Sequence, residues 1–279
     1  MKKKIKVLYI VGAGNSGSTL LSMVLGAHKK AISVGELNHI GRYAQSPDML
    51  CSCSQPFSKC VFWSKIHTPD LDHLLPISGY LNTLKRNWKA LKLNNNDKAT
   101  IKVNEYLYTE ISNISKSQII IDSSKDMRRL CYLTRSEIIE VIPLYLVRDV
   151  RAYMDSYTRR KQGPSLFGAF RWLRLNMQTI LGLQVLGLMK ACIKVNFQDF
   201  TNTPEKHLKD ICKILGIEYS DEMLEYHLKT NHNLAGTNSA TRLKPIASDQ
   251  KWRDRMTFSQ KLIYFVSGIW IFNHLIKAQ

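Results

Sequence analysis

An apolar run that leads directly into a glycine-rich turn constrains the fold of this chain more than any other feature. Residues Lys4–Val11 are rich in Val, Ile and Leu, and the sequence GAGNSGST follows at residues 12–19. A helix is expected over Ser18–Ala27, so the turn joins a buried strand to a helix N-terminus. Backbone N–H groups in such a turn converge on an anion, and the helix dipole adds partial positive charge. We therefore predict a phosphate-binding loop, with ligand contacts from Gly14, Asn15, Ser16, Gly17, Ser18 and Thr19.

Strands and helices alternate along the rest of the chain. After the first strand, the expected strands are Ala31–Val34, Gln118–Ile121, Val141–Val147 and Ala191–Phe197. This alternation predicts an α/β fold, a three-layer, P-loop-like parallel sheet flanked by helices. No linker divides the sequence, so residues 1–279 are expected to form a single domain. Two mostly helical insertions, at about 47–113 and 164–190, are expected over the site, where they would recognise an acceptor.

The loop departs from a nucleoside triphosphatase motif at one position. The spacing Gly12-x4-Gly17-x-Thr19 matches the P-loop frame, but Ser18 stands where the lysine that reaches the β- and γ-phosphates is expected. Triphosphate hydrolysis is therefore poorly supported. Three alternatives stay open at this point: a P-loop small-molecule kinase or NTPase, a non-catalytic anion-binding protein, and a glycine turn without a ligand.

A second candidate anion site follows the strand Val141–Val147. Arg148 comes directly after this strand, where side chains face the crevice of a parallel sheet, and Ser156 lies eight residues further on, two turns into a helix. A guanidinium and a hydroxyl together suit a second phosphate. The alternative is a structural ion pair between Arg148 and Asp149.

These two motifs, GAGNSGSTLL and LVRDVRAYMDS, together resemble the nucleotide-binding signatures of the sulfotransferase superfamily. Further similar stretches are Gly35-Glu36-Leu37, CSCSQPFSKCVFW, Asp122–Lys125 and Lys251–Arg253. The chain lacks a Lys-Thr-His stretch, so it looks closer to the bacterial and Golgi-like branch (tyrosylprotein and carbohydrate sulfotransferases) than to the cytosolic one. The resemblance implies transfer of a sulfuryl group from PAPS (3′-phosphoadenosine 5′-phosphosulfate) to an acceptor hydroxyl, with PAP (adenosine 3′,5′-bisphosphate) leaving.

The resemblance also implies roles for individual residues. Glu36 is expected to be the catalytic base, with its pKa lifted by burial, and His39 is its substitute. Asn15 replaces the basic residue that the family carries in the loop, so Lys125 is expected to supply the catalytic cation. The alternative is that Lys125 pairs with Asp122 or Asp126. The cofactor-binding set is completed by Arg148 and Ser156 at the 3′-phosphate and by Arg242, Lys251 and Trp252 closing over the nucleotide. No metal is expected. Trp252 is expected to pack rather than stack on the ligand.

The charge of the chain indicates anionic partners without naming them. Forty Lys and Arg against 22 Asp and Glu give a net charge of +18, which attracts polyanions. The basic residues are spread along the chain, so nucleic acid is not expected. The expected acceptors are a glycan, a lipid-linked sugar or another small metabolite, with peripheral membrane contact possible.

No segment has the composition of a membrane span or a secretory signal, so a cytoplasmic location is expected. Leu262–Ile276 is the most apolar stretch. We expect it to form a buried C-terminal helix, with a membrane-surface helix as the alternative.

Six cysteines in this context are expected to be reduced. Cys51, Cys53 and Cys60 cluster, and together with His67 they present zinc-ligand chemistry. Their spacing matches no standard zinc knuckle, so structural cysteines are the favoured interpretation.

Overall fold

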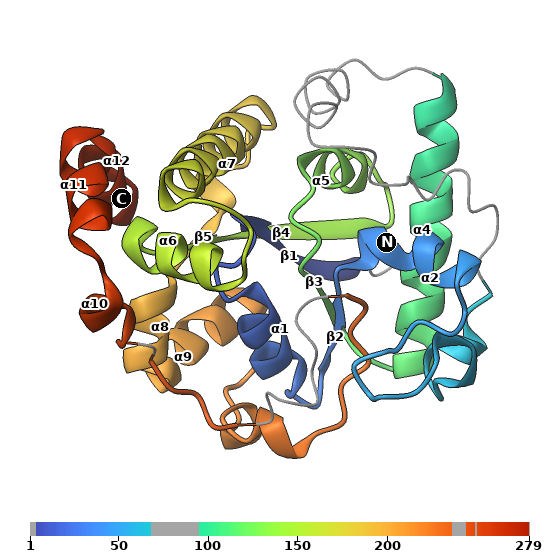
Figure 1. The fold of residues 1–279 in the computed structure, drawn as a ribbon. Helices are drawn as coiled ribbons and strands as arrows, with labels where there is room; N and C mark the ends of the chain where they lie inside the picture. Colours follow the sequence, from blue (N-terminus) through green and yellow to red (C-terminus); the bar gives the residue numbers. More distant parts are fainter. Residues whose placement is uncertain (1–3, 68–94, 236–243, 249, 279) are drawn as a thin grey trace.

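Five parallel strands form a single sheet in the part of the chain that the structure describes, residues 4–67, 95–235, 244–248 and 250–278 of this computed structural model (Figure 1). The strand order is β2-β3-β1-β4-β5. The strands are β1 (Ile5–Gly12), β2 (Ala31–Gly35), β3 (Ile119–Asp122), β4 (Ile139–Val147) and β5 (Ile193–Asn196). The predicted α/β fold with a parallel sheet is therefore confirmed.

Helices cover both faces of this sheet (Figure 1). The helices connecting or following the first three strands are α1 (Ser18–Gly26), α2 (Ile40–Gln45), α4 (Asn95–Ser115) and α5 (Met127–Leu133). Those after β4 are α6 (Val150–Arg159), α7 (Ser165–Val185), α8 (Phe197–Asn202) and α9 (Pro204–Leu215). The C-terminal helices are α10 (Trp252–Arg255), α11 (Phe258–Val266) and α12 (Ile269–Ala278). In Figure 1, α5 and α7 lie on one side of the sheet and α1, α8 and α9 on the other.

The central strand β1 shows why the sequence forms three layers. Successive side chains of a strand point to opposite faces. Val7 and Tyr9 pack into the core beneath α4, α5 and α7, whereas Leu8 and Ile10 pack into the core shared with α1 and α9. All four are completely buried. Because both faces are covered, β1 is apolar throughout instead of alternating with polar residues.

Successive strands are added first on one side of β1 and then on the other. The strands β2 and β3 lie on one side of β1, and the chain then crosses to β4 and β5 on the other. The switch point thus falls between β1 and β4, whose carboxyl ends carry the glycine loop and Arg148 respectively. In open parallel sheets ligands bind at such a point.

The end of β2 is fixed by a distant segment. The N–H of Leu234 donates to the carbonyl of Val34 at 3.0 Å, and the N–H of Glu36 donates to the carbonyl of Leu234 at 2.8 Å. Gly35 lies between these bonds with φ +72°, and a Cβ there would fall 2.4 Å from the carbonyl oxygen of Leu234. Only glycine fits this close approach.

The C-terminal segment differs from its expected form. Residues 262–276 do not form a single buried helix, because Gly268, with φ +66°, separates α11 from α12. Tyr264, Ile269 and Ile276 are buried. Apolar side chains that stay exposed on these two helices are Phe258, Leu262, Phe265, Val266, Trp270, Ile271 and Leu275. No helix within the described residues has the length and apolar content to cross a membrane.

The first insertion is only partly described. Residues 68–94 lie outside the described residues. In the remainder of 47–113, α4 covers 95–113, whereas 47–67 consist of turns and the 3-10 helices Phe57–Lys59 and Trp63–Lys65. The second insertion is helical as expected, although α7 ends at Val185, before a short 3-10 helix at Met189–Ala191.

Candidate active site

The glycine loop between β1 and α1 has the form of an anion cradle. Gly17 caps α1 in the left-handed region, with φ +91°, and a Cβ there would lie 2.0 Å from the ring of Phe197. The hydroxyl of Ser16 is buried and has no hydrogen-bond partner among the described residues. The loop therefore presents a hydroxyl and the first amides of a helix toward a ligand.

A lysine joins this loop to a carboxylate at the end of β2. The ammonium of Lys125 lies 2.8 Å from Oε1 of Glu36 and 3.3 Å from Oγ of Ser18, and it donates to the carbonyl of Ser123 at 2.6 Å. The Lys125 backbone is left-handed, with φ +59°. On its other oxygen, Glu36 faces Nε2 of His39 at 3.4 Å. The two sequence-predicted catalytic residues are thus in direct contact beside the loop.

The protonation of Glu36 differs from the expectation. Burial by itself raises the pKa of this carboxyl, as predicted. The ammonium of Lys125 and the hydrogen bonds from His39 and Lys125 outweigh burial and lower the pKa to about 2. The expected upward shift was therefore wrong, because the sequence did not reveal that the two residues pair. Glu36 is therefore ionised at neutral pH, and its contact with Lys125 makes it a weaker base than a free carboxylate.

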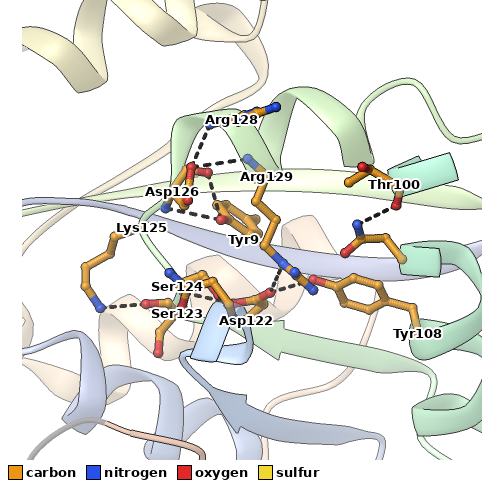
Figure 2. A network of polar contacts seen from close by, with 12 residues as sticks. Tyr9, Thr100, Tyr108, Asp122, Ser123, Ser124, Lys125, Asp126, Arg128 and Arg129 are labelled. Atoms are coloured by element: carbon orange, nitrogen blue, oxygen red, sulfur yellow. Dashed lines mark hydrogen bonds and ion pairs between the residues drawn. The ribbon is translucent and has the colours of Figure 1, made fainter. Parts of the chain in front are cut away.

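A buried carboxylate holds the turn that carries Lys125. Asp122, at the end of β3, is completely buried. It accepts hydrogen bonds from the hydroxyl of Tyr108 at 2.5 Å, from the backbone N–H of Ser124 at 2.8 Å and from Nε of Arg129 at 3.3 Å (Figure 2). The hydroxyl of Ser124 also donates to it. This network fixes the turn after β3 from which Lys125 projects.

The hydrogen bonds around Lys125 show which acidic residue pairs with it. The sequence left open a pairing with Asp122 or Asp126. Asp122 is occupied by Tyr108, Ser124 and Arg129, and Asp126 caps α5 by accepting from the backbone N–H of Arg128 at 2.8 Å (Figure 2). Lys125 turns instead toward Glu36.

Arg148 lies at the other side of the loop. It follows β4 and is 9% exposed, its Nη1 donates to the carbonyl of Asn15 at 2.7 Å, and its guanidinium lies 5.4 Å from the ring centre of Phe197. Asp149 accepts from Nη2 of Arg151 at 2.8 Å and caps α6. Ser156 is buried within α6. Asn15 itself bonds through its amide group to Gln162 at 3.0 Å.

The three C-terminal residues of the expected nucleotide lid have different outcomes. Arg242 lies outside the described residues. Trp252 is 3% exposed, and the guanidinium of Arg151 lies 5.0 Å from its ring centre, so the indole packs against α6. Lys251 is exposed directly before α10. Arg255 joins α10 to α6 through a 2.8 Å contact with Asp155.

Comparison with solved structures identifies the fold of this chain. No protein-family model matches the chain, and no curated protein matches it significantly. Among solved structures, the sulfotransferase domain from the curacin biosynthetic pathway aligns with a TM-score of 0.52 and 15% identity, over 94% of this chain and 96% of that one. The sulfotransferase domain of the Synechococcus PCC 7002 olefin synthase aligns with a TM-score of 0.50 and 20% identity, over 95% and 88%. This chain has the sulfotransferase fold.

Within this sulfotransferase fold, charged groups of both signs gather at one edge of the sheet. The loop, Lys125 and Arg148 offer amide, ammonium and guanidinium donors, which suit a ligand carrying more than one anionic group. Glu36 places an ionised carboxylate next to these donors. The arrangement suits group transfer between an anionic donor and a proton-bearing acceptor.

Proposed function

We propose that this chain is a sulfotransferase that moves a sulfuryl group from PAPS to a hydroxyl of an acceptor. The observation that carries the proposal is the position of the Lys125 ammonium, which contacts both the loop hydroxyl of Ser18 and the carboxylate of Glu36. An ammonium that would serve the donor and a carboxylate that would serve the acceptor are thus in contact. The fold shared with two sulfotransferase domains supports the same reaction.

The residues present fit the donor at the loop. The buried hydroxyl of Ser16 leaves one hydrogen bond to be made, and a Cβ built at Gly14 would meet no atom within 4 Å, so this side of the loop is open. The amides of Asn15–Thr19 and the hydroxyls of Ser16, Ser18 and Thr19 would hold the 5′-phosphosulfate. Lys125 would neutralise charge on the oxygen that leaves.

At the other end of the donor, Arg148 and Ser156 would hold the 3′-phosphate. Arg148 is already positioned by the carbonyl of Asn15 and by Phe197. A guanidinium held in this way loses little side-chain entropy on binding a phosphate. Lys251, Trp252 and Arg242 would complete the nucleotide side, with Trp252 acting through its packing on α6.

On the acceptor side, Glu36 would take the proton. PAPS supplies an activated sulfuryl group, and the bond formed is between the acceptor oxygen and sulfur. The bond broken joins sulfur to the bridging phosphate oxygen, so that PAP leaves. Glu36 would accept the hydroxyl proton as this exchange proceeds, and His39, 3.4 Å from it, would hold the carboxylate in orientation.

For the acceptor we propose a carbohydrate or another small metabolite, including a lipid-linked sugar. The net charge of +18 favours an anionic acceptor or surface. The exposed apolar side chains of α11 and α12, including Phe265 and Trp270, support peripheral membrane contact. The bacterial and Golgi-like branch and a cytoplasmic location stay predictions from the sequence.

Nucleotide-dependent stabilisation tests the donor. We expect PAP at 100 times its Kd to stabilise the protein by about 2.7 kcal/mol, which raises the Tm by several degrees. ATP with Mg²⁺ is expected to stabilise far less, because Ser18 replaces the loop lysine. Stabilisation by ATP–Mg²⁺ and not by PAP would replace this proposal with a kinase or NTPase.

Transfer is tested with heavy-sulfur PAPS. The protein is incubated with this donor and a small-molecule extract, and mass spectrometry searches for a sulfated product that carries the label. A labelled product that is absent with Glu36→Gln supports the enzyme. PAP binding without any labelled product, across extracts and a panel of sugars, phenols and alcohols, would instead identify an anion-binding protein.

A further inference from the structure

Four metal-ligating side chains that are not part of the proposed active site lie close together. Cys51, Cys53 and Cys60 lie on the segment between α2 and the 3-10 helix Trp63–Lys65, and His232 comes from the segment before Leu234. Their sulfur and nitrogen atoms all lie within 4.8 Å of one another. His67, which the sequence placed with the cysteines, is exposed and is not part of this group.

Two distances within the group match a tetrahedral zinc shell. With Zn–S near 2.3 Å and Zn–N near 2.0 Å, tetrahedral geometry places two sulfur ligands about 3.8 Å apart, and a sulfur and a nitrogen about 3.5 Å apart. The sulfurs of Cys53 and Cys60 are separated by 3.6 Å, and Cys60 Sγ lies 3.3 Å from Nδ1 of His232. A disulfide between Cys53 and Cys60 would need about 2.05 Å and would leave the other two groups without a role.

Two of the three cysteines are shielded from water. Cys51 is 2% exposed and Cys60 is completely buried. Burial of this kind keeps water from competing for a bound metal.

The histidine is held in place by its neighbours. The ring of Phe62 stacks on the His232 ring with a centroid distance of 5.6 Å. The indole N–H of Trp63 donates to the carbonyl of His232 at 2.6 Å. Both contacts orient the imidazole with Nδ1 toward Cys60, as a ligand requires.

We propose that this chain binds one Zn²⁺ ion through Cys51, Cys53, Cys60 and His232. Three cysteines and one histidine complete four-coordination, so the ion has no open position and its role is structural. The site joins the 51–60 segment to the 232–234 segment, which pairs with the end of β2 beside Glu36. The proposal is independent of the sulfuryl-transfer activity.

Metal content of the purified full-length protein is the first test. We expect about one zinc per chain by elemental mass spectrometry after expression in zinc-supplemented medium. Cys53→Ser, Cys60→Ser and His232→Asn are expected to lower the zinc content at least fivefold. The controls are His67→Asn and Cys192→Ser, which remove a histidine and a cysteine outside the group and are expected to retain full zinc. Loss of zinc with His67→Asn and not with His232→Asn would overturn the ligand set.

Cobalt keeps the test decisive even if the variants fail to fold. Wild-type protein, stripped by a chelator under reducing conditions, is titrated with Co²⁺. We expect one equivalent to give the strong visible absorption of tetrahedral cobalt and the near-ultraviolet band of thiolate ligation. Absence of both bands, together with zinc-free protein or a Cys53–Cys60 disulfide in peptide mass maps, would refute the site.

Discussion

Lys125 donates to Oε1 of Glu36 at 2.8 Å, although 89 residues separate the two in sequence. The contact exists because β2 and β3 are neighbours and parallel, so the residues after each strand meet at the same edge. Lys125 keeps the carboxyl of Glu36 ionised, and neither side chain is more than a quarter exposed. The proposed base and the proposed cation therefore form one unit, and the expected effects of substitution follow from this pairing.

Replacing the carboxylate of Glu36 tests the proton acceptor. Glu36→Gln keeps the shape of the side chain but cannot take a proton, and we expect turnover to fall about 100-fold or more. PAP affinity is expected not to fall, since Lys125 stays beside the loop and no longer faces a competing carboxylate. Steady-state transfer to an acceptor found with heavy-sulfur PAPS, with calorimetric PAP binding, provides both numbers. Glu205→Gln, in an exposed pair with Lys209, is the control, and full turnover of Glu36→Gln would exclude Glu36 as the base.

The stability of the fold at acidic pH is expected to depend on the pair of Glu36 and Lys125. The pKa of Glu36 falls from 4.5 to about 2 on folding. Ionised Glu36 therefore stabilises the fold above pH 4.5, and this contribution disappears as the pH falls through 2. We expect the free energy of unfolding of the wild type to exceed that of Glu36→Gln by on the order of 2–3 kcal/mol at pH 6. This difference is expected to be smaller at pH 3. Urea unfolding at pH 6, 4 and 3 measures it, and a gap that does not vary with pH would contradict the lowered pKa.

Replacing Arg148 with alanine tests whether this residue binds the 3′-phosphate and not the 5′-phosphate. We expect PAP to bind about 10–150-fold more weakly, from the loss of charged hydrogen bonds worth about 1.5–3 kcal/mol. Adenosine 5′-monophosphate lacks the 3′-phosphate, so its affinity is expected to fall at most about fivefold, through loss of the bond to Asn15. Calorimetry with both nucleotides measures the difference, and Arg148→Lys controls for charge. Equal losses for the two nucleotides would mean that Arg148 serves only the loop.

Two glycines with nearly the same φ allow conformational strain to be distinguished from steric clash. Gly35 and Gly187 have φ of +72° and +70°, but a Cβ at Gly187 meets nothing within 4 Å, whereas one at Gly35 meets the carbonyl of Leu234 at 2.4 Å. Gly187→Ala is expected to cost about 1–2 kcal/mol. Gly35→Ala is expected to cost at least about 3 kcal/mol and to lower turnover, because Glu36 follows it. If the two variants lost the same Tm, the backbone at Leu234 would have to move easily to accommodate a Cβ at position 35.

The fold was predictable because its signals are local. The apolar run before Gly12, the loop and the next helix lie within two dozen residues, and the same kind of strand followed by a polar turn recurs before Lys125 and Arg148. Placing these turns at one sheet edge needs only the parallel arrangement of the strands. The location of Glu36 near the loop followed in the same way.

What sequence reasoning missed depends on contacts between distant residues or on local backbone detail. The low pKa of Glu36 arises from Lys125, and burial alone gave the wrong sign. His232 joins cysteines about 172 residues away, so the nearer His67 was considered instead. At the C-terminus, the left-handed Gly268 divides a continuous apolar stretch into two helices, which exposes side chains such as Phe265.

The two contacts of Lys125 also bear on the order in which substrates bind. One ammonium serves both Ser18 and Glu36, so an anionic donor at the loop competes with the carboxylate for it. As the ammonium moves toward the donor, burial raises the pKa of Glu36, and the carboxylate becomes a stronger base only once the donor is present. We therefore expect compulsory-order kinetics with PAPS first, in which an unreactive acceptor analogue inhibits uncompetitively with respect to PAPS.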